Sequence, residues 1–363
     1  MAKMSTLAAS RLGFEISILD KENFSPAGKH TRNEFVGWVD DDELLTQFAK
    51  PCDVITLENE FIDHHRLEFL EKLGKRVYPS SHTIALIQDK LLQKEVLSNA
   101  GIPVPRFVAV APYNTYRQIA SLVGTPFVLK SRKMGYDGYG NAMVRTEKDF
   151  VEGTKKLSSR HSTLLAESFI DFQMELAVMV VRTKREIKVY PVVQTIQKNH
   201  ICHTVIAPAQ ISKRIAKEAK EIAIECVKAV QGFGLFGIEM FLSNNDIIVN
   251  EMAPRPHNSG HYSIEGCVTS QFENHIRAVL NVPLGSTEMI SKFAVMINLL
   301  GKENPHSAAE RYALALKNPH VHLHVYGKEH SRVGRKMGHI TMLGNDLKKI
   351  LHELNSIEKK IRL

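Results

Sequence analysis

Residues 250–261, NEMAPRPHNSGH, carry the types of side chain that a site for a cation and an anion requires. The segment follows an apolar run, DIIV, so Glu251 stands where a buried strand would end. Two prolines restrict the backbone of the turn that carries Arg255 and His257. A carboxylate, a cation and a hydrogen-bonding ring on a stiff turn are typical of a preorganised site. We therefore expect functional roles for Glu251, Arg255 and His257.

Glu251 has a candidate partner upstream, at Glu239. The segment 232–252 is typical of a β-hairpin that turns at Asn244–Asn245. With a three-residue loop, the two acids would lie opposite each other, with Cβ atoms roughly 5 Å apart. Such like charges repel, and Mg²⁺ would turn the pair into a metal site beside the neutral oxygen of Asn250. With a two-residue loop the acids would point to opposite faces, so the sequence leaves the geometry open.

A glycine-rich loop, KMGYDGYGN, is the second candidate site. Its glycines, Gly135, Gly138 and Gly140, match neither of the two common phosphate-loop patterns, and strands are expected on both sides. A hairpin flap could close its backbone N–H groups over phosphates, with Lys130 as a point charge. A plain glycine hairpin without a ligand explains the loop equally well.

A basic cluster near the C-terminal end is the third candidate. The segment HVYGKEHSRVGRKMGHI contains Lys328, Arg332, Arg335 and Lys336. Arginine binds phosphate oxygens in a bidentate manner, so the cluster could hold a phosphate. On these residues alone, a solvated loop is the favoured interpretation. Near the other end of the chain, Glu58 and Glu60 share one face of an expected strand, which suits a surface pair or a ligand-facing pair equally.

Strands and helices alternate in the first part of the chain. Strands are expected at 15–20, 34–39, 52–60 and 76–80, and helices at 1–14, 41–50, 64–75 and, as one continuous helix, 80–100. This alternation predicts a parallel sheet covered by helices, in which ligands bind beyond the carboxyl ends of the strands. Gly13 is expected to end the first helix, and the break after Gly101 is expected to be a domain boundary.

The rest of the chain contains further strands around the glycine loop and around the hairpin. Beyond residue 101 we expect strands flanking the loop and at 162–170 and 174–183, helices at 212–230 and 270–280, a strand-rich tail to about 343 and a charged final helix.

The composition favours a globular enzyme. The 363 residues are 44% hydrophobic and 24% charged, enough for a substantial core. The net charge of +8 is spread along the chain, which favours an enzyme for anionic substrates over a nucleic-acid-binding protein. No apolar run approaches the roughly 18 residues of a membrane span. The four cysteines form no CxxC pair, which predicts a reducing, cytoplasmic location.

The order of the motifs resembles one enzyme family. VLK, GYDGYGN, Glu167 at a strand end, GIEMF, NEMAPRPHNSGH, TSQFENHIRA and finally YGK with GRKMGH occur in this order. They resemble the ATP-grasp enzymes and, within them, the 5-(carboxyamino)imidazole ribonucleotide synthetases of purine biosynthesis. The resemblance covers about residues 10 to 343, and NEMAPRPHNSGH and GRKMGH are specific to that branch.

The resemblance implies an α/β fold with α+β character in its central part. It implies an N-terminal parallel α/β (pre-ATP-grasp) domain at 1–100, an ATP-grasp domain at 101–290 with a mobile lid at about 104–166, and a small β-rich C-terminal domain at 291–363. Family members open with a strand and a glycine-rich turn that this sequence does not contain. We therefore expect an N-terminal domain that lacks its first strand, and hypothesise that Met1 is an internal methionine or a truncated start.

The reaction that the resemblance implies uses ATP, bicarbonate and Mg²⁺. ATP phosphorylates bicarbonate to carboxyphosphate, and the amine of aminoimidazole ribonucleotide captures its CO₂ equivalent. The resemblance also implies a homodimer. A separate mutase is expected to take up the product, and the spread of charge and the lack of a long apolar run predict no nucleic-acid or membrane partner. Two alternatives stay open: another ATP-grasp carboxylase or ligase with a different acceptor, and a degenerate nucleotide-binding protein.

The resemblance also implies the residues of the site. ATP would be bound by Lys90 and Lys130 at its phosphates, by the flap Gly135, Tyr136, Asp137, Gly138, Tyr139, Gly140 and Asn141, by the adenine hinge Glu167, Ser168, Phe169 and Ile170, by Glu175 at the ribose, and by Asn250 and Glu251. Glu239 and Glu251 would bind Mg²⁺. Tyr136, Asp137, Arg255 and His257 would be catalytic, and Glu58, Lys328 and Arg335 would bind the acceptor.

One position of the flap departs from the family pattern. The family usually has arginine or lysine where this chain has Tyr139. A cation expected near the reacting anion is therefore missing. We expect Arg132 or Lys133 to replace it, or the flap to act mainly through its backbone.

Overall fold

The computed structural model describes residues 1–135, 140–159, 163–302 and 307–361. Four residues of the predicted flap, Tyr136, Asp137, Gly138 and Tyr139, lie outside the described residues, so their expected roles stay predictions. Within the described ranges, no helix is long and apolar enough to cross a membrane.

The N-terminal region alternates between helices and strands, as predicted. Its elements are α1 (Ala2–Arg11), β1 (Ser17–Asp20), the 3-10 turn η1 (Gly28–His30), β2 (Asn33–Val36), α2 (Asp42–Ala49), β3 (Val54–Thr56), α3 (His64–Lys72) and β4 (Arg76–Tyr78). Gly13, with a left-handed φ of 80°, follows the end of α1. The strands are parallel as predicted, but they form two separate pairs, β1–β2 and β3–β4, and not one continuous sheet. Their carboxyl ends bring Asp20 and Glu58 to the same cleft.

The helix predicted at 80–100 is two helices, α4 (Ser81–Gln88) and α5 (Lys90–Asn99), so the prediction of one continuous helix is wrong. Asp89 leaves the helical conformation, and its carboxylate accepts a hydrogen bond from Leu91 N–H as the N-cap of α5. Arg132 holds this break from a distant part of the chain, because its guanidinium binds the Asp89 carboxylate and its carbonyl accepts from Lys90 N–H. The break places Lys90 in the first turn of α5.

A small antiparallel sheet carries the glycine loop. Its strand order is β5 (Phe107–Val110), β8 (Leu164–Ser168), β6 (Phe127–Ser131), β7 (Asn141–Val144), and α6 (Tyr116–Val123) and α7 (Glu147–Ser158) cover one face. Along β6, Phe127 and Leu129 are fully buried against these helices. Since side chains alternate along a strand, Val128 and Lys130 point to the opposite face, where they line the cleft.

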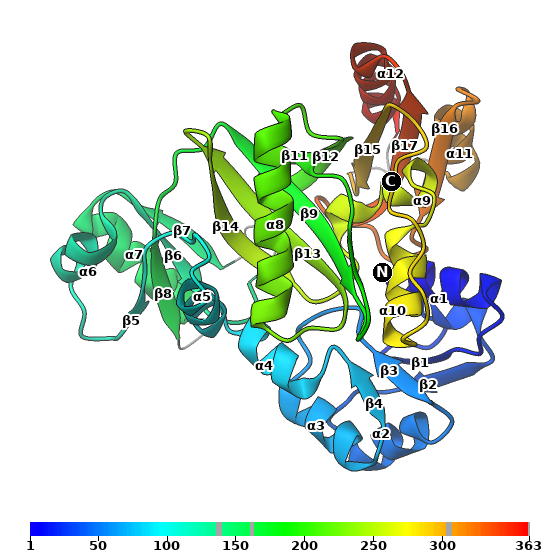
Figure 1. The fold of residues 1–363 in the computed structure, drawn as a ribbon, viewed down its shortest axis with the longest axis horizontal. Coiled ribbons are helices and arrows are strands. Elements are labelled where there is room, and N and C mark those ends of the chain that lie inside the picture. The colour runs from blue at the N-terminus through cyan, green and yellow to red at the C-terminus, as the bar shows by residue number, and fades with distance from the viewer. Residues whose placement is uncertain (136–139, 160–162, 303–306, 362–363) are drawn as a thin grey trace.

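A large antiparallel sheet forms the centre of the molecule (Figure 1). Its order is β14 (Asp246–Ala253), β13 (Gly234–Ser243), β9 (Met174–Arg182), β11 (Val193–Lys198), β12 (Ile201–Ala207), β15 (Phe293–Leu300), β17 (Lys336–Gly344), β16 (Val321–Val325), with β10 (Ile187–Val189) also on β9. The predicted C-terminal region thus contributes three strands to the same sheet as the central region. The remaining elements are η2 (Asn258–Gly260), α9 (Ser263–Gly266), α10 (Gln271–Val279), α11 (Ala308–Leu316) and α12 (Leu347–Lys360).

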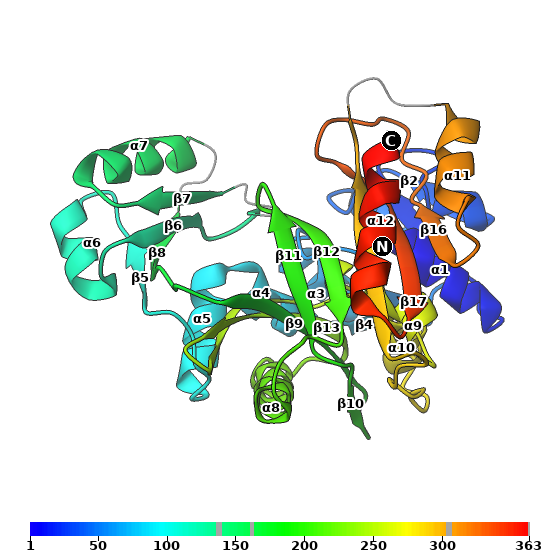
Figure 2. The ribbon, with the colours of Figure 1, turned by 90° about the horizontal axis from the view of Figure 1, so that it is seen from above.

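The helix α8 (Lys213–Ala229) covers one face of this sheet, below it in Figure 2. Its buried residues recur every three or four positions and pack against alternate residues of β13, including Phe236, Ile238 and Met240. Burying each large apolar side chain stabilises the fold by roughly 1.5–3 kcal/mol. The intervening residues Glu239 and Phe241 therefore face away from α8 and line the cleft on the other side of the sheet.

Candidate active site

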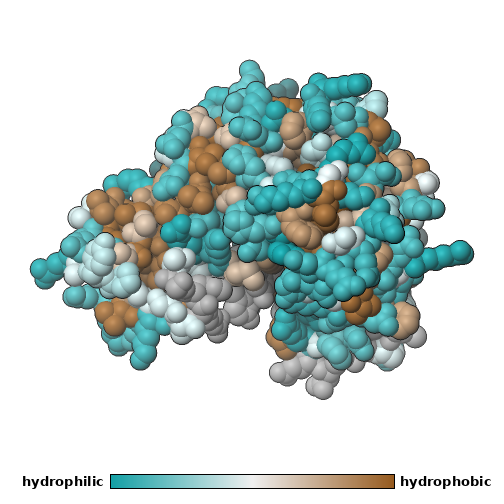
Figure 3. Space-filling view, turned by 90° about the horizontal axis from the view of Figure 1, so that it is seen from below, coloured by the Kyte–Doolittle hydropathy of each residue, from teal (hydrophilic) through white to brown (hydrophobic). Residues whose placement is uncertain are grey.

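A cleft of about 1010 Å³ lies between the small sheet, the hairpin β13–β14 and the carboxyl ends of β1 and β3. It opens at the notch at the lower edge of Figure 3, between the lobe of the small sheet and the rest of the molecule. Most described residues of the predicted site line it: Glu58, Lys90, Lys130, Gly135, Asn141, Glu167, Ser168, Phe169, Ile170, Glu175, Glu239, Asn250, Glu251, Arg255, His257 and Lys328. The lining residues that the structure describes do not include Gly140 and Arg335.

The hairpin combines a two-residue turn with a β-bulge, which neither predicted register contained. Asn244 and Asn245 form the turn, with left-handed φ values of 51° and 69°. Further along, the register shifts and leaves Asn250 as an extra residue. The shift pairs Glu239 directly with Glu251. The expectation that a two-residue loop would separate the acids is therefore wrong, because the bulge restores the facing pair.

The two facing carboxylates have different electrostatic surroundings. Burial, and next the charge of Glu251, raise the pKa of Glu239 to about 8. Burial acts in the same direction on Glu251, but Lys90 and Lys130 outweigh it and hold the pKa of Glu251 well below its usual range. Lys90 also forms an ion pair with Glu251. A divalent cation would relieve the repulsion of the pair, with the oxygen of Asn250 beside it, so these donors fit Mg²⁺.

Lys130 connects the small sheet to the hairpin. Its Nζ lies 2.7 Å from Glu167 Oε2 and donates to Asn250 Oδ1 at 3.2 Å. Glu167 is buried, which alone would raise its pKa, but Lys130 and Lys94 lower the pKa of its carboxyl below the ordinary value. The Glu167 carboxylate is thus paired with lysines. Any contact of this residue with an adenine ring would have to use its backbone.

The far end of the cleft is more apolar. Phe172 and Phe241 stack there with ring centroids 4.7 Å apart, next to the predicted hinge residues Phe169 and Ile170. Glu175 lies close by, and burial raises the pKa of its carboxyl although Gln197 donates a hydrogen bond to it. An aromatic pair beside a hydrogen-bonding carboxylate suits a flat base attached to a sugar.

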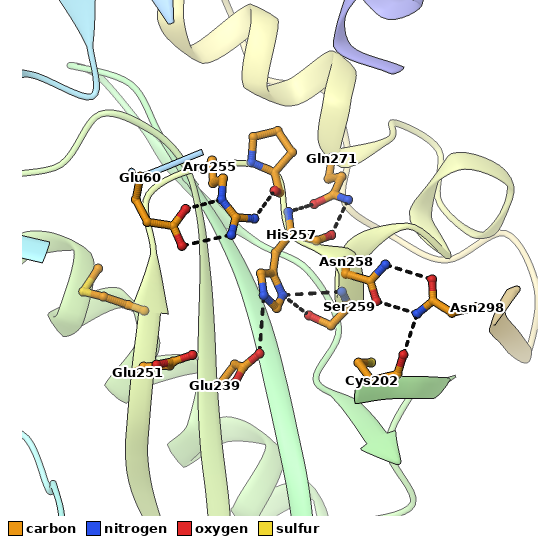
Figure 4. A network of polar contacts seen from close by, with 12 residues as sticks. Glu60, Cys202, Glu239, Glu251, Arg255, His257, Asn258, Ser259, Gln271 and Asn298 are labelled. Carbon is orange, nitrogen blue, oxygen red and sulfur yellow. Dashed lines mark hydrogen bonds and ion pairs between the residues drawn. The ribbon is translucent and has the colours of Figure 1, made fainter. Parts of the chain in front are cut away.

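The turn after β14 is fixed by hydrogen bonds on both sides (Figure 4). Arg255 forms a two-fold ion pair with Glu60 and donates to Pro256 O. Gln271 of α10 accepts from His257 N–H at 2.9 Å and donates to His257 O at 2.7 Å. The two prolines restrict the backbone inside the turn but do not fix the position of the turn as a whole. These contacts hold it against the N-terminal region and α10.

The His257 ring points toward the carboxylate pair (Figure 4). Its Nε2 lies 3.3 Å from Glu239 Oε1, and its Nδ1 lies 2.8 Å from Ser259 Oγ. Burial, and next the charge of Arg255, lower the pKa of His257 to about 3. His257 is therefore a neutral ring at pH 7 that can take part in hydrogen bonds beside the candidate metal site.

The basic side chains at the other end of the cleft differ in position. Lys328 Nζ donates to Lys336 O at 2.8 Å and lies 5.7 Å from the centre of the Tyr326 ring. Both lysines line the cleft. Arg335 instead donates to His330 O at 2.7 Å. The structure thus brings Lys328 to the site and adds Lys336, while among the described residues Arg335 has no contact in the cleft that supports its predicted role.

Arg132 and Lys133, the two residues that could replace the cation missing at position 139, have different contacts in the structure. Arg132 lines the cleft, but its guanidinium is bound to both carboxylate oxygens of Asp89. Lys133 lines the cleft beside the start of the flap. Lys133 is therefore the better placed of the two.

Several cleft residues were not predicted: Gln93, Phe172, Gln197, His200, Phe241, Tyr326 and Lys336. Two of them had a signal in the sequence. Phe241 lies two residues after Glu239 on the same strand, so it shares the face of that carboxylate. Gln93 lies three residues after Lys90, so it shares the side of α5 that faces the hairpin.

Comparison with known proteins assigns each part of the chain to a family. Residues 1–88 match a ribonucleotide synthetase preATP-grasp domain, residues 95–272 an ATP-grasp domain, and residues 294–353 a phosphoribosylaminoimidazole carboxylase C-terminal domain.

Similar proteins cover nearly the whole chain. An N5-carboxyaminoimidazole ribonucleotide synthase of Synechococcus elongatus is 41% identical over 345 residues, covering 94% of this chain and 87% of that protein. A phosphoribosylaminoimidazole carboxylase of Ogataea methanolica is 40% identical over 368 residues, covering 99% of this chain and 67% of that protein. The chain spans 62% of the related carboxylase of Candida glabrata, so part of that protein has no counterpart here.

Solved structures agree with these relatives. The N5-carboxyaminoimidazole synthase of Aspergillus clavatus, in complex with ADP and 5-aminoimidazole ribonucleotide, is 36% identical with a TM-score of 0.91, and covers 99% of this chain and 96% of that chain. The N5-carboxyaminoimidazole ribonucleotide synthetase of Thermotoga maritima is 41% identical with a TM-score of 0.87 and the same coverage. The predicted fold class is confirmed. The chain belongs to the ATP-grasp family, in the branch of the N5-carboxyaminoimidazole ribonucleotide synthetases.

Proposed function

We propose that the protein is an ATP-dependent ligase that carboxylates the amine of 5-aminoimidazole ribonucleotide to N5-carboxyaminoimidazole ribonucleotide in purine biosynthesis. The facing pair of Glu239 and Glu251 carries this proposal, because it lies between the lysines Lys90 and Lys130 and the neutral ring of His257. This arrangement places groups for a metal ion and a phosphate chain, and a neutral hydrogen-bonding ring, in one cleft.

Glu239, Glu251 and Asn250 hold Mg²⁺ in this proposal. When bound, the ion would supply positive charge that stabilises the negative charge moving during phosphoryl transfer. Lys90 and Lys130 bind the same phosphates, since their ammonium groups lie against this cluster, at Glu251 and at Asn250 respectively. The flap at 135–141 covers the phosphates and excludes water from a labile intermediate.

The reaction proceeds in two steps. A bicarbonate oxygen attacks the γ-phosphorus of ATP, the bond to the β-phosphate oxygen breaks, and ADP and carboxyphosphate form. The amine of the acceptor then attacks the carboxyl carbon, directly or as released CO₂, and the C–O bond to phosphate breaks. The departing phosphate takes the proton that the amine loses, and the neutral ring of His257 accepts a hydrogen bond beside Glu239. Arg255, Tyr136 and Asp137 complete the anion site.

The two ends of the cleft select the two nucleotides. Adenine lies against the hinge from Glu167 to Ile170, with its ribose on Glu175. The phosphate of the acceptor is bound by Lys328, with Lys336 adding positive charge, and Glu58 faces the acceptor. Arg335 joins this site only if its side chain leaves His330 O.

Further features of this proposal rest on the resemblance. They are the three domains at 1–100, 101–290 and 291–363, a homodimer, a mutase that takes up the product, and a cytoplasmic location. The location is also supported by the four cysteines, which are all free thiols.

Phosphate release tests the proposal. The protein is incubated with Mg²⁺, ATP and bicarbonate, with and without 5-aminoimidazole ribonucleotide, and other amines serve as control acceptors. The proposal predicts that 5-aminoimidazole ribonucleotide raises the rate above slow bicarbonate-dependent hydrolysis. An equal rate without it, or a larger increase with another amine, would favour a ligase with a different acceptor. Intact ATP binding without turnover would indicate a degenerate nucleotide-binding protein.

A further inference from the structure

Three side chains of α5 contact four consecutive residues of β14. Lys90 forms an ion pair with the Glu251 carboxylate. Gln93 pairs with the next residue, Met252, accepting from its N–H at 3.0 Å and donating to its carbonyl at 3.2 Å. Lys94 donates to the carbonyls of Val249 and Asn250, at 3.2 and 2.5 Å. These residues lie at spacings of three and four along α5 and therefore on one side of the helix.

The Lys94 contacts lie at the bulge itself. Asn250 is the extra residue that the ladder between β13 and β14 leaves unpaired. Its carbonyl therefore needs a donor from outside the sheet. Lys94 supplies this donor, while the Asn250 side chain receives Lys130. The ammonium group of Lys94 thus binds, from the α5 side, the bulge that makes the two carboxylates face each other.

An ammonium group is a costly donor for a purely structural contact at this depth. Lys94 is 1% exposed, and burial lowers its pKa to about 8 despite the nearby charge of Glu167, whose Oε1 lies 3.6 Å from Lys94 Nζ. A neutral amide could satisfy the same carbonyls without the desolvation of a full charge. A positive charge beside the Asn250 carbonyl instead offsets part of the repulsion between the two carboxylates.

We propose that Lys94 is a positioning residue for the metal-binding pair, holding the bulge at Asn250 so that Glu239 and Glu251 face each other across β13–β14. Lys94 does not line the cleft among the described residues, so it acts through β14 and does not touch the ligand. This inference rests on the proposed function only in assigning Mg²⁺ to the carboxylate pair. It does not depend on which amine is carboxylated.

The test measures ADP binding by calorimetry, in excess Mg²⁺ and in excess chelator, for the wild-type chain and for Lys94→Met. The ratio of the two affinities reports the metal-linked part of binding. We expect this ratio to fall about tenfold in Lys94→Met, since supporting residues of metal sites contribute on the order of 10–100-fold. ADP affinity in chelator should stay near the wild-type value. Lys217→Met, at an exposed lysine of α8, is the matched control and should keep the wild-type ratio.

A thermal melt verifies that each variant is folded, and Lys94→Gln provides a milder replacement that keeps N–H donors but loses the positive charge. If Lys94→Met does not fold, the ratio in Lys94→Gln decides, with a reduced ratio expected. An unchanged ratio in a folded variant overturns the proposal. An equal loss of ADP affinity with and without Mg²⁺ also overturns it, because Lys94 would then act on the nucleotide. A wild-type chain without any metal-linked gain contradicts both this inference and the proposed metal site, whereas a change of acceptor preference affects neither.

Discussion

Glu239 and Glu251 repel each other across the hairpin, and the residues around them determine how that repulsion is used. Lys90 pairs with Glu251, which keeps one carboxylate charged, while Glu239 lies beside the neutral ring of His257. The result is one anionic and one protonatable acid in the same pair. A metal ion that binds here would displace a proton from Glu239, so the metal affinity of the cleft depends on pH.

Replacing Glu239 by Gln removes one metal ligand and one half of a repelling pair. We expect the rate of ATP cleavage to fall on the order of 100-fold at fixed Mg²⁺. The free energy of unfolding of the metal-free variant should stay equal or rise, because glutamine avoids the cost of burying an acid whose pKa is raised to about 8 in the folded state. Steady-state phosphate release and urea denaturation measure the two effects. Glu225→Gln, at an exposed acid of α8, should change neither. A variant that loses stability together with activity would mean that Glu239 is structural.

Lys328 is the lysine that we place at the acceptor phosphate. Lys328→Met should raise the KM for 5-aminoimidazole ribonucleotide about 10–100-fold, since a hydrogen bond to a charged group contributes about 1.5–3 kcal/mol. The slow ATP cleavage without acceptor should not change. Initial rates against acceptor concentration provide the measurement, with the exposed Lys349→Met on α12 as the control. An unchanged KM would place the acceptor phosphate elsewhere, for example at Lys336.

Two irregular elements position these residues, and neither could be predicted from local sequence. The helical pattern from 80 to 100 continues through Asp89, and the break there depends on Arg132, 43 positions away along the chain. The bulge at Asn250 depends on donors from α5 in the same way. The regular elements were predictable because apolar periodicity and turn residues such as Asn244–Asn245 act locally. The sequence predicted which two acids form the pair but left the register of the hairpin open. That register depends on a single extra residue, Asn250.

Asp89→Ala tests the joint between α4 and α5. The variant loses the N-cap of α5, which costs about 1 kcal/mol, and also leaves the Arg132 guanidinium without its carboxylate. The free energy of unfolding should therefore fall by more than about 1 kcal/mol, and the KM for ATP should rise because Lys90 loses its fixed position. Urea denaturation compares it with Ser212→Ala, which removes the cap of α8 alone. Equal losses in both variants would show that the Arg132 contact contributes nothing.

At the scale of the whole molecule, three parts of the chain meet at one cleft. The small sheet brings Lys130, the hairpin brings the carboxylates, and the strands β16 and β17 bring the cations near Lys328. The sequence predicted which motifs belong together through their order, but not that the last strands extend the central sheet. That joining depends on the long-range pairing of β12 with β15, for which no local pattern exists.

Buried histidines connect these parts and predict acid sensitivity. Burial lowers the pKa of His275 to about 4, where its Nδ1 accepts from Leu235 N–H and its Nε2 lies 2.8 Å from Thr56 Oγ1. Burial also lowers the pKa values of His261 and His339 well below their usual range. Below pH 6.5 the unfolded chain takes up protons at these rings and the folded chain does not. The free energy of unfolding should therefore fall from pH 6.5 to about 4, by up to roughly 1.4 kcal/mol per pH unit for each ring.

Glu239 has the opposite effect on the free energy of unfolding. Its pKa is raised to about 8 in the folded state, so its protonation favours the folded state as the pH falls from 8. One such group does not offset three histidines. Denaturation at pH 7 and pH 5 measures the balance, and His275→Gln should reduce the difference, whereas His320→Gln at the surface should not. Equal stability at both pH values would contradict the neutral, buried state of these rings.

The oxygen atoms of bicarbonate show directly whether the proposed carboxyphosphate forms. The protein is incubated with Mg²⁺, ATP, 5-aminoimidazole ribonucleotide and ¹⁸O-labelled bicarbonate, and the released phosphate is analysed by mass spectrometry before the label exchanges with water. Because a bicarbonate oxygen attacks the γ-phosphorus and stays with it when the C–O bond breaks, the account predicts one ¹⁸O atom in each phosphate released with product. Phosphate that carries oxygen only from ATP and water would contradict it.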